Sequence, residues 1–205
     1  MTIRRAGEHA LLVETGSTAV AHRLDALLRA DRPEHVEDIV PGQETVLVVA
    51  PDADQERLES RLAGLLASAE AAGSQEAGTP VGTVEIPVVY DGADLESVAA
   101  LTGLGVDEVI ALHAGSEFVV GWLGFAPGFA YLLGLDPRLH VPRLDAPRTS
   151  VPPGSVAIAG PYSAVYPSAS PGGWRLLGRT DLRVWDVAAD PPAKLPPGTR
   201  VRFVP

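Results

Sequence analysis

The stretch that decides the fold of this chain is residues 121–180, GWLGFAPGFAYLLGLDPRLHVPRLDAPRTSVPPGSVAIAGPYSAVYPSASPGGWRLLGRT. Glycine and proline recur along it, with aromatic residues among them. Glycine permits positive φ and close backbone approach, whereas proline fixes φ and removes a hydrogen-bond donor. Such a stretch favours loops of defined shape, and aromatic faces beside exposed N–H groups can form a small-molecule pocket. The alternative is a proline-rich β domain whose loops have a structural role only and bind no ligand.

Around this stretch, short apolar runs separated by Pro/Gly turns predict a series of β-strands. Within it and beyond it we expect strands at 155–159, 164–166, 174–178, 183–187 and 199–204. Before it we expect a strand at 83–90, helices at 94–102 and 106–113, and a strand at 117–123. Pro87 indicates an edge or a bulge in the first of these strands, and Asp94 is a candidate helix cap. The spacing is typical of a closed or nearly closed β-barrel.

The N-terminal part has a different pattern. We expect strands at 9–14, 35–40 and 45–50, with helices at 18–30 and 54–70. The first helix carries one apolar stripe, with Ser17 or Thr18 as its cap, and Asp52 or Asp54 is suited to cap the second. This order predicts a small α/β sandwich, a sheet covered on one face by two helices. Residues 71–80 (AAGSQEAGTP) break every periodicity, so we expect an α+β protein with domains at 1–78 and 79–205.

Composition narrows the range of functions. The chain has 205 residues, 46% of them hydrophobic, and a formal net charge of −10, which argues against nucleic acid and anionic membrane surfaces as partners. It contains no cysteine, which excludes disulfides and thiolate chemistry. The sequence shows neither a signal peptide nor an apolar run long enough to span a bilayer. We therefore expect a cytoplasmic protein.

The sequence contains no familiar catalytic motif. The five histidines lack metal-ligand spacing, the serines form no G-x-S-x-G elbow, and no G-x-x-x-x-G-K-[ST] phosphate loop is present. We expect no metal site. His113, at the end of a predicted helix, is better explained as a structural or capping residue than as a general base.

The arginines of the central stretch are more informative. Arg143, Arg148, Arg175 and Arg179 lie among its glycines and prolines, and guanidinium suits carboxylate or phosphate. One or two of them could face an anionic ligand, and the alternative is that they tie loops to backbone carbonyls. Asp181 could pair with Arg179. Residues 170–174 (SPGGW) could present consecutive N–H groups to an anion.

The central stretch closely resembles the family of the 5-oxoprolinase B subunit (PxpB), which also includes the sporulation-kinase inhibitor KipI and allophanate hydrolase subunit 1. The matching pieces are 124–132 (GFAPGFAYL), 142–143 (PR), 146–149 (APRT), 151–156 (VPPGSV), 159–160 (AG), 166–167 (YP), 170–174 (SPGGW) and 178–180 (GRT). Upstream, 7–14 (GEHALLVE), 86–88 (IPV) and 109–110 (VI) with His113 are also similar. The resemblance covers nearly the whole chain, although residues 160–165 depart from the pattern of many relatives.

The resemblance implies a small N-terminal α/β sandwich followed by a cyclophilin-like β-barrel. It implies a protein that works with the C and A subunits of 5-oxoprolinase, the complex using ATP to hydrolyse 5-oxoproline (pyroglutamate) to glutamate. On this hypothesis Arg148 and Arg179 hold anionic groups, and the Gly172-Gly173 backbone supplies donors. The substrate-binding residues expected are Phe125, Pro127, Phe129, Arg148, Ser155, Tyr166, Gly172, Gly173, Trp174 and Arg179.

Two other functions remain compatible with the same resemblance. One is a regulatory protein that inhibits a sensor histidine kinase, as KipI does. The other is an accessory component of a urea carboxylase or allophanate hydrolase system. A proline isomerase would rest on analogy of fold alone.

Overall fold

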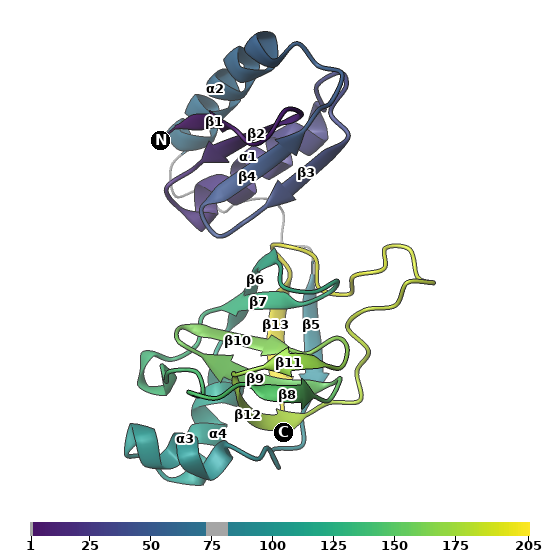
Figure 1. Cartoon of the computed structure of the whole chain (residues 1–205). Coiled ribbons are helices and arrows are strands. Elements are labelled where there is room, and N and C mark those ends of the chain that lie inside the picture. Colours follow the sequence, from purple (N-terminus) through teal and green to yellow (C-terminus); the bar gives the residue numbers. More distant parts are fainter. Residues whose placement is uncertain (1, 73–81) are drawn as a thin grey trace. The chain divides into compact units, whose positions relative to one another are not determined.

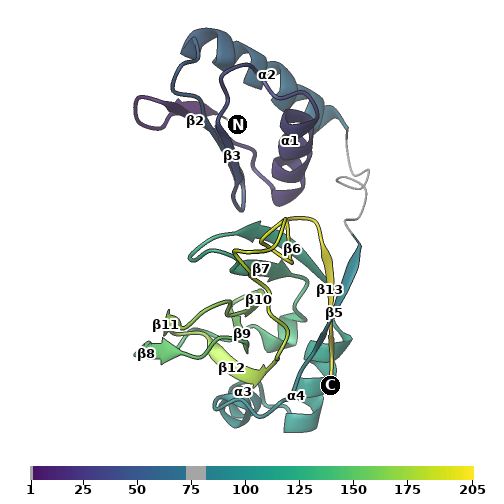
Figure 2. The ribbon, with the colours of Figure 1, turned by 90° about the vertical axis from the view of Figure 1, so that its right-hand side faces the viewer.

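The computed structural model describes residues 2–72 and 82–205. The chain divides into two compact units, Met1–Thr79 and Pro80–Pro205. The boundary expected between residues 78 and 79 lies outside the described residues. Each unit has its own sheet (Figures 1 and 2) and its own buried residues, and the two are described separately.

The first unit is a four-stranded antiparallel sheet with two helices. Its strands are β1 (Ile3–Arg5), β2 (Ala10–Glu14), β3 (Asp38–Pro41) and β4 (Thr45–Val49), in the order β1-β2-β4-β3. The helices are α1 (Thr18–Ala30) and α2 (Gln55–Ala71). Buried residues alternate with more accessible ones along β2 and β4, which places one face of the sheet against the helices. The predicted sandwich is therefore confirmed.

Local sequence explains both helix starts. The Ser17 hydroxyl accepts a hydrogen bond from the Val20 N–H, and the Asp54 carboxylate accepts from Glu56 and Arg57. Two details differ from expectation. Strand β3 begins at Asp38 rather than at residue 35, because His35 has a positive φ of 65°. The sequence does not predict strand β1, because its three largely exposed residues carry no apolar alternation.

The second unit is built on a seven-stranded sheet in the order β12-β9-β10-β7-β6-β13-β5. Its strands are β5 (Thr83–Pro87), β6 (Phe118–Leu123), β7 (Ala130–Leu133), β9 (Ser155–Ala159), β10 (Tyr162–Val165), β12 (Arg175–Arg179) and β13 (Arg200–Val204). Only the β5–β13 pair is parallel among these pairings. A separate ribbon pairs β8 (Arg148–Val151) with β11 (Ser170–Gly172). Helices α3 (Leu95–Thr102) and α4 (Val106–Gly115) pack against each other near β12 and β13, and a short 3-10 turn spans Pro137–Leu139.

The seven-stranded sheet curls until its two edges meet. Beyond the end of β5, Val89 forms an antiparallel bridge with Arg179 of β12, with both N···O distances 2.9 Å. Glycine makes this approach possible: a Cβ at Gly178 would lie 2.3 Å from the Val89 carbonyl oxygen, and one at Gly92 would lie 2.3 Å from that of Leu176. The curled sheet confirms the α+β class and the expected barrel-like second part.

The strand predictions are correct in part. The strands expected at 155–159, 174–178 and 199–204 are present within a residue or so, and the one at 164–166 overlaps the last two residues of β10. The strand expected at 183–187 is wrong, since that segment contributes only the bridge between Trp185 and Ala193. The sequence does not predict strands β7, β8 and β11, because glycine and proline around them mimic loop sequence.

Candidate functional site

A tight loop between β6 and β7 carries the first part of the site. The Gly124 N–H donates to the Phe129 carbonyl (3.1 Å), and the Phe129 N–H donates to that of Ala126 (3.0 Å). Inside the loop Phe125 has a φ of 67° and a 62% exposed side chain. Positive φ in a bulky residue is a strained conformation of the kind found at functional sites. The loop therefore holds an aromatic ring at the surface at a conformational cost.

Phe129 is the centre of an aromatic cluster. It is buried, and its ring meets those of Phe125, Tyr131, Tyr166 and Trp174 edge to face, with centroids 5.2–5.4 Å apart. This is the arrangement that aromatic quadrupoles prefer. The rings come from the loop after β6, from β7, and from the segments after β10 and β11, so only the folded barrel assembles them.

These rings border a small cavity of about 80 Å³. Its lining is Phe125, Phe129, Tyr131, Arg143, Tyr166, Pro171, Gly172, Gly173 and Trp174. We call it the aromatic pocket. It is smaller than the roughly 300–1,000 Å³ of sites for drug-sized ligands. It therefore has room for a small ring or a side group, and not for a nucleotide.

The polar groups of the aromatic pocket are few. A Cβ on Gly172 would lie 2.3 Å from the Tyr166 hydroxyl, so the absence of a side chain at Gly172 lets the phenol rest against the backbone. Burial raises the pKa of Tyr166, while a hydrogen bond from the Trp174 backbone and the positive charge of Arg143 act in the opposite direction. The phenol is thus neutral at physiological pH and can donate a hydrogen bond.

Six of the ten substrate-binding residues expected from the sequence line the aromatic pocket: Phe125, Phe129, Tyr166, Gly172, Gly173 and Trp174. The other four do not line it. Pro127 is exposed on the loop, and the Ser155 hydroxyl donates to the Pro152 carbonyl (2.8 Å). Both arginines of the hypothesis, Arg148 and Arg179, are engaged elsewhere.

Arg148 and Arg179 pair with carboxylates of the same unit. Arg148 Nη2 donates to Asp94 Oδ1 (2.8 Å), and the other oxygen of this buried carboxylate accepts from the Leu176 N–H (2.7 Å). Arg179 Nε donates to Asp91 (2.9 Å), not to Asp181 as the sequence suggested. These contacts tie the start of α3 and the segment before it to β8 and β12, and they favour a structural role.

Three lining residues, Tyr131, Arg143 and Pro171, are absent from the set expected from the sequence. The Arg143 guanidinium carbon lies 5.9 Å from the centre of the Trp174 ring, a cation–π distance. Arg143 is one of four arginines in the central stretch, and no local pattern distinguishes it from the other three. Tyr131 stacks on Trp122 at 4.6 Å and lies in β7, a strand that the sequence does not predict.

His113 lies outside the aromatic pocket, in the interior of the barrel. Its Nδ1 is 2.8 Å from the Tyr90 hydroxyl and its Nε2 is 2.9 Å from Ser163 Oγ. Since the Ser163 hydroxyl donates to the Ala157 carbonyl, Nε2 must donate to Ser163 and Nδ1 must accept from Tyr90. Burial lowers the pKa of His113 to about 3. The residue is a neutral structural tie between α4 and the sheet.

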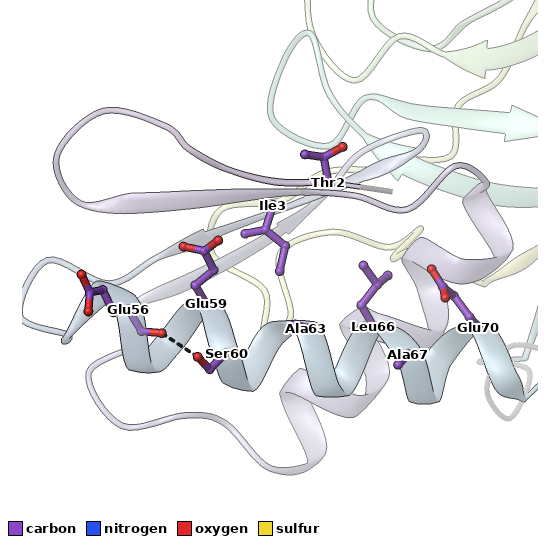
Figure 3. A pocket seen from close by; sticks show the side chains of 9 residues that line it. All are labelled: Thr2, Ile3, Glu56, Glu59, Ser60, Ala63, Leu66, Ala67 and Glu70. Carbon is purple, nitrogen blue, oxygen red and sulfur yellow. Dashed lines mark hydrogen bonds between the residues drawn. The ribbon is translucent and has the colours of Figure 1, made fainter.

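The first unit has a wider groove of about 820 Å³ between β1 and α2, lined by Thr2, Ile3, Glu56, Glu59, Ser60, Ala63, Leu66, Ala67 and Glu70 (Figure 3). The Ser60 hydroxyl donates to the Glu56 backbone carbonyl (3.0 Å), so it is not poised as a nucleophile. Within residues 2–72 and 82–205, no three His, Asp or Glu side chains gather in a way that could hold a metal ion. In the same ranges no helix is long and apolar enough to cross a membrane.

Comparison with known proteins relates this geometry to named relatives. The chain is 54% identical over 125 residues to the 5-oxoprolinase B subunit of Escherichia coli O157:H7, covering 60% of this chain and 57% of that protein. It is 48% identical over 124 residues to the protein of the same name from Bacillus subtilis, covering 59% and 52%. The chain thus spans about half the length of the curated relatives it matches. Urea amidolyase of Saccharomyces cerevisiae is 30% identical over 120 residues, 55% of this chain and 6% of that protein.

Solved structures agree with the fold. TTHA0988 superposes with a TM-score of 0.81 at 36% identity, covering 99% of this chain and 40% of that one. PH0987 from Pyrococcus horikoshii gives 0.58 at 39% identity, covering 100% and 97%. The sequence profile of the carboxyltransferase domain, subdomains C and D, matches residues 1–195. The chain therefore belongs to the family of carboxyltransferase domains, subdomains C and D.

Proposed function

We propose that this chain is the B subunit of an ATP-dependent 5-oxoprolinase that hydrolyses 5-oxoproline to glutamate. The observation that carries the proposal is its identity of 54% and 48% to two proteins that bear this name. The residues that line the aromatic pocket all fall within 124–180, the part of the sequence where the family motifs are densest. The C and A subunits are the partners, and the complex acts in the cytoplasm.

The chemistry explains why ATP and partners are needed. A five-membered lactam is a poor electrophile. Transfer of the γ-phosphoryl group of ATP to its amide oxygen makes the carbon attackable by water, and the products are glutamate, ADP and phosphate. The described lining of the aromatic pocket supplies two phenols, an arginine and glycine backbone, but no carboxylate or histidine that could act as a base. This supports a division of labour in which the pocket positions the substrate and the partners supply the remaining groups.

The test is glutamate release from 5-oxoproline and ATP. It compares this chain alone, the chain co-expressed with the C and A subunits, and the same two partners without it. Release only when all three are present is the expected result. An assembled complex that releases no glutamate would refute the proposal.

A urea-linked function is the second candidate, favoured by the 30% identity to urea amidolyase. The same samples are given urea, bicarbonate and ATP, and phosphate release is followed. Turnover of urea in place of 5-oxoproline would select this alternative. Inactivity on both substrates, with the complex intact, would favour the kinase-inhibitor function.

A further inference from the structure

We infer that Arg143 binds the carboxylate of the ligand of the aromatic pocket, and that this ligand is a compact single-ring carboxylic acid with a carbonyl acceptor. The choice of 5-oxoproline as the ring rests on the proposed function. The assignment of Arg143 rests on the contacts of the arginines around the pocket, on the polar groups at its floor and on its size.

The arginines of the central stretch differ in what they contact. Arg148 and Arg179 are paired with Asp94 and Asp91. Arg175 donates to the Pro142 carbonyl (2.9 Å) and to the Ser97 hydroxyl (3.3 Å). Arg143 makes no hydrogen bond or ion pair through its guanidinium with the described residues, and the guanidinium lies over the face of Trp174. Arg148 Nη1 is buried without a hydrogen-bond partner in the part of the chain that the structure describes, but its guanidinium already shares the charge of Asp94 and does not line the aromatic pocket. Arg143 is therefore the arginine of this group that lines the pocket and has no carboxylate partner among the described residues.

The position of Arg143 is set by its neighbours. The Leu144 N–H donates to the Gly173 carbonyl (2.7 Å), which fastens the segment that carries Arg143 to the turn before Trp174. A guanidinium over an indole face is held by the ring quadrupole, while its N–H groups stay free at the edge. Because Arg143 lines the aromatic pocket, its guanidinium can offer hydrogen-bond donors to a ligand there, and a guanidinium can bind a carboxylate with two bonds.

At the floor of the aromatic pocket, Tyr166 supplies a second recognition point. Its hydroxyl lies against the Gly172 backbone in the pocket lining and can donate its phenol proton to an acceptor in the cavity. A ligand that offers a carboxylate to Arg143 and a carbonyl oxygen to Tyr166 satisfies both. A lactam acid such as 5-oxoproline carries these two groups on one ring.

The size and walls of the pocket restrict the rest of the ligand. The volume of about 80 Å³ is enough for a few water molecules, each needing roughly 10–15 Å³, or for one small ring. Phe125, Phe129 and Trp174 provide apolar surfaces for the faces of such a ring. Phe125 has an exposed side chain and a strained backbone. Its ring is therefore suited to cover a ligand on the solvent side of the pocket.

The experiment measures binding to the assembled complex by calorimetry, with two probes that differ only in the carboxylate: 5-oxoproline and 2-pyrrolidinone. Arg143→Gln should weaken the binding of 5-oxoproline by about 10- to 100-fold, because a pair of charge-assisted hydrogen bonds is lost. The affinity for 2-pyrrolidinone, which has no carboxylate, should be unchanged. Arg138→Gln is the matched control, because Arg138 is exposed and paired with Asp136, and it should alter neither.

The outcomes separate this inference from the proposed function. A complex that hydrolyses 5-oxoproline with an unchanged KM in Arg143→Gln overturns the inference and leaves the function intact. If the complex binds 5-oxoproline through Arg143 but releases no glutamate, the inference is supported and the proposed function is refuted. Equal weakening of both probes, or no binding of 5-oxoproline by the wild-type complex, also overturns the inference.

Discussion

At the scale of single residues, His113 shows how burial sets chemistry. It is fully buried, it stacks on Phe203 at 4.5 Å, and both of its nitrogens are hydrogen-bonded. Its pKa is lowered from 6.5 to about 3 because the charged form would lose its hydration inside the barrel. A histidine in this state is not a general base at neutral pH. It is instead a group whose protonation opposes folding.

This gives a prediction for stability against pH. The folded-state pKa of His113 lies below the unfolded one, so its contribution is complete above about pH 6.5 and is lost as pH falls toward 3. In that window His113 should reduce the free energy of unfolding by about 1.4 kcal/mol per pH unit. Urea unfolding between pH 7 and pH 4.5 should show a shallower slope in His113→Gln, whereas exposed His9→Gln should match the wild type. Identical slopes in all three proteins would contradict the assignment.

At the scale of elements, the closure of the barrel depends on glycine, whose missing side chain lets two backbone segments approach closely. Strand β12 meets the segment after β5 at the Val89–Arg179 bridge, and the N–H groups of Gly92 and Asp94 also donate to carbonyls of β12. Gly178 lies where that segment crosses. Edge strands that meet and pair are removed from solvent and from intermolecular pairing. A side chain at this position would separate the two edges.

We therefore predict that Gly178→Ala destabilises the protein by about 1–3 kcal/mol, the usual cost of overpacking, because its Cβ would overlap the Val89 carbonyl. The matched control is Gly64→Ala in helix α2, where a Cβ would meet nothing within 4 Å. That change should stabilise the chain by about 0.5–1 kcal/mol, since alanine is the better helix former. Thermal unfolding of the two variants checks this, and equal shifts in Tm would be inconsistent with barrel closure at Gly178.

At the scale of the whole molecule, each compact unit buries its own apolar residues. One cluster joins α1, α2 and their sheet, and two further clusters fill the barrel and the aromatic region. A unit with its own core can fold without the other. On this basis we propose that the chain has two domains, residues 1–78 and 79–205.

The corresponding prediction concerns fragments. Residues 82–205 alone should unfold cooperatively on heating, as followed by circular dichroism. A shorter fragment, 89–205, lacks β5 and with it the parallel pairing to β13, including buried Ile86 beside Phe203. It should not fold. Two fragments that behave alike would mean that the proposed boundary does not delimit an independent unit.

Some features follow from local sequence because their causes are local. The ranges of α1 and α2 come from apolar stripes and from caps at Ser17 and Asp54, all within a few residues of each other. Several barrel strands are predictable for the same reason. Segments whose pairing partners lie far along the chain, such as the β8–β11 ribbon, and very short exposed strands such as β1 carry no pattern of their own and escape prediction.

The sequence by itself determined the family, the α+β class and most of the walls of the aromatic pocket. An aromatic side chain supplies a large apolar surface and a glycine a flexible backbone, and both properties belong to the residue type itself. Only the tertiary structure decided which arginine is available. Arg148 meets Asp94 across 54 positions of sequence, and Arg179 meets Asp91 across 88. Whether a guanidinium forms an ion pair depends on which carboxylates the fold places beside it. Because those carboxylates are distant in the sequence, no local pattern predicts the pairing.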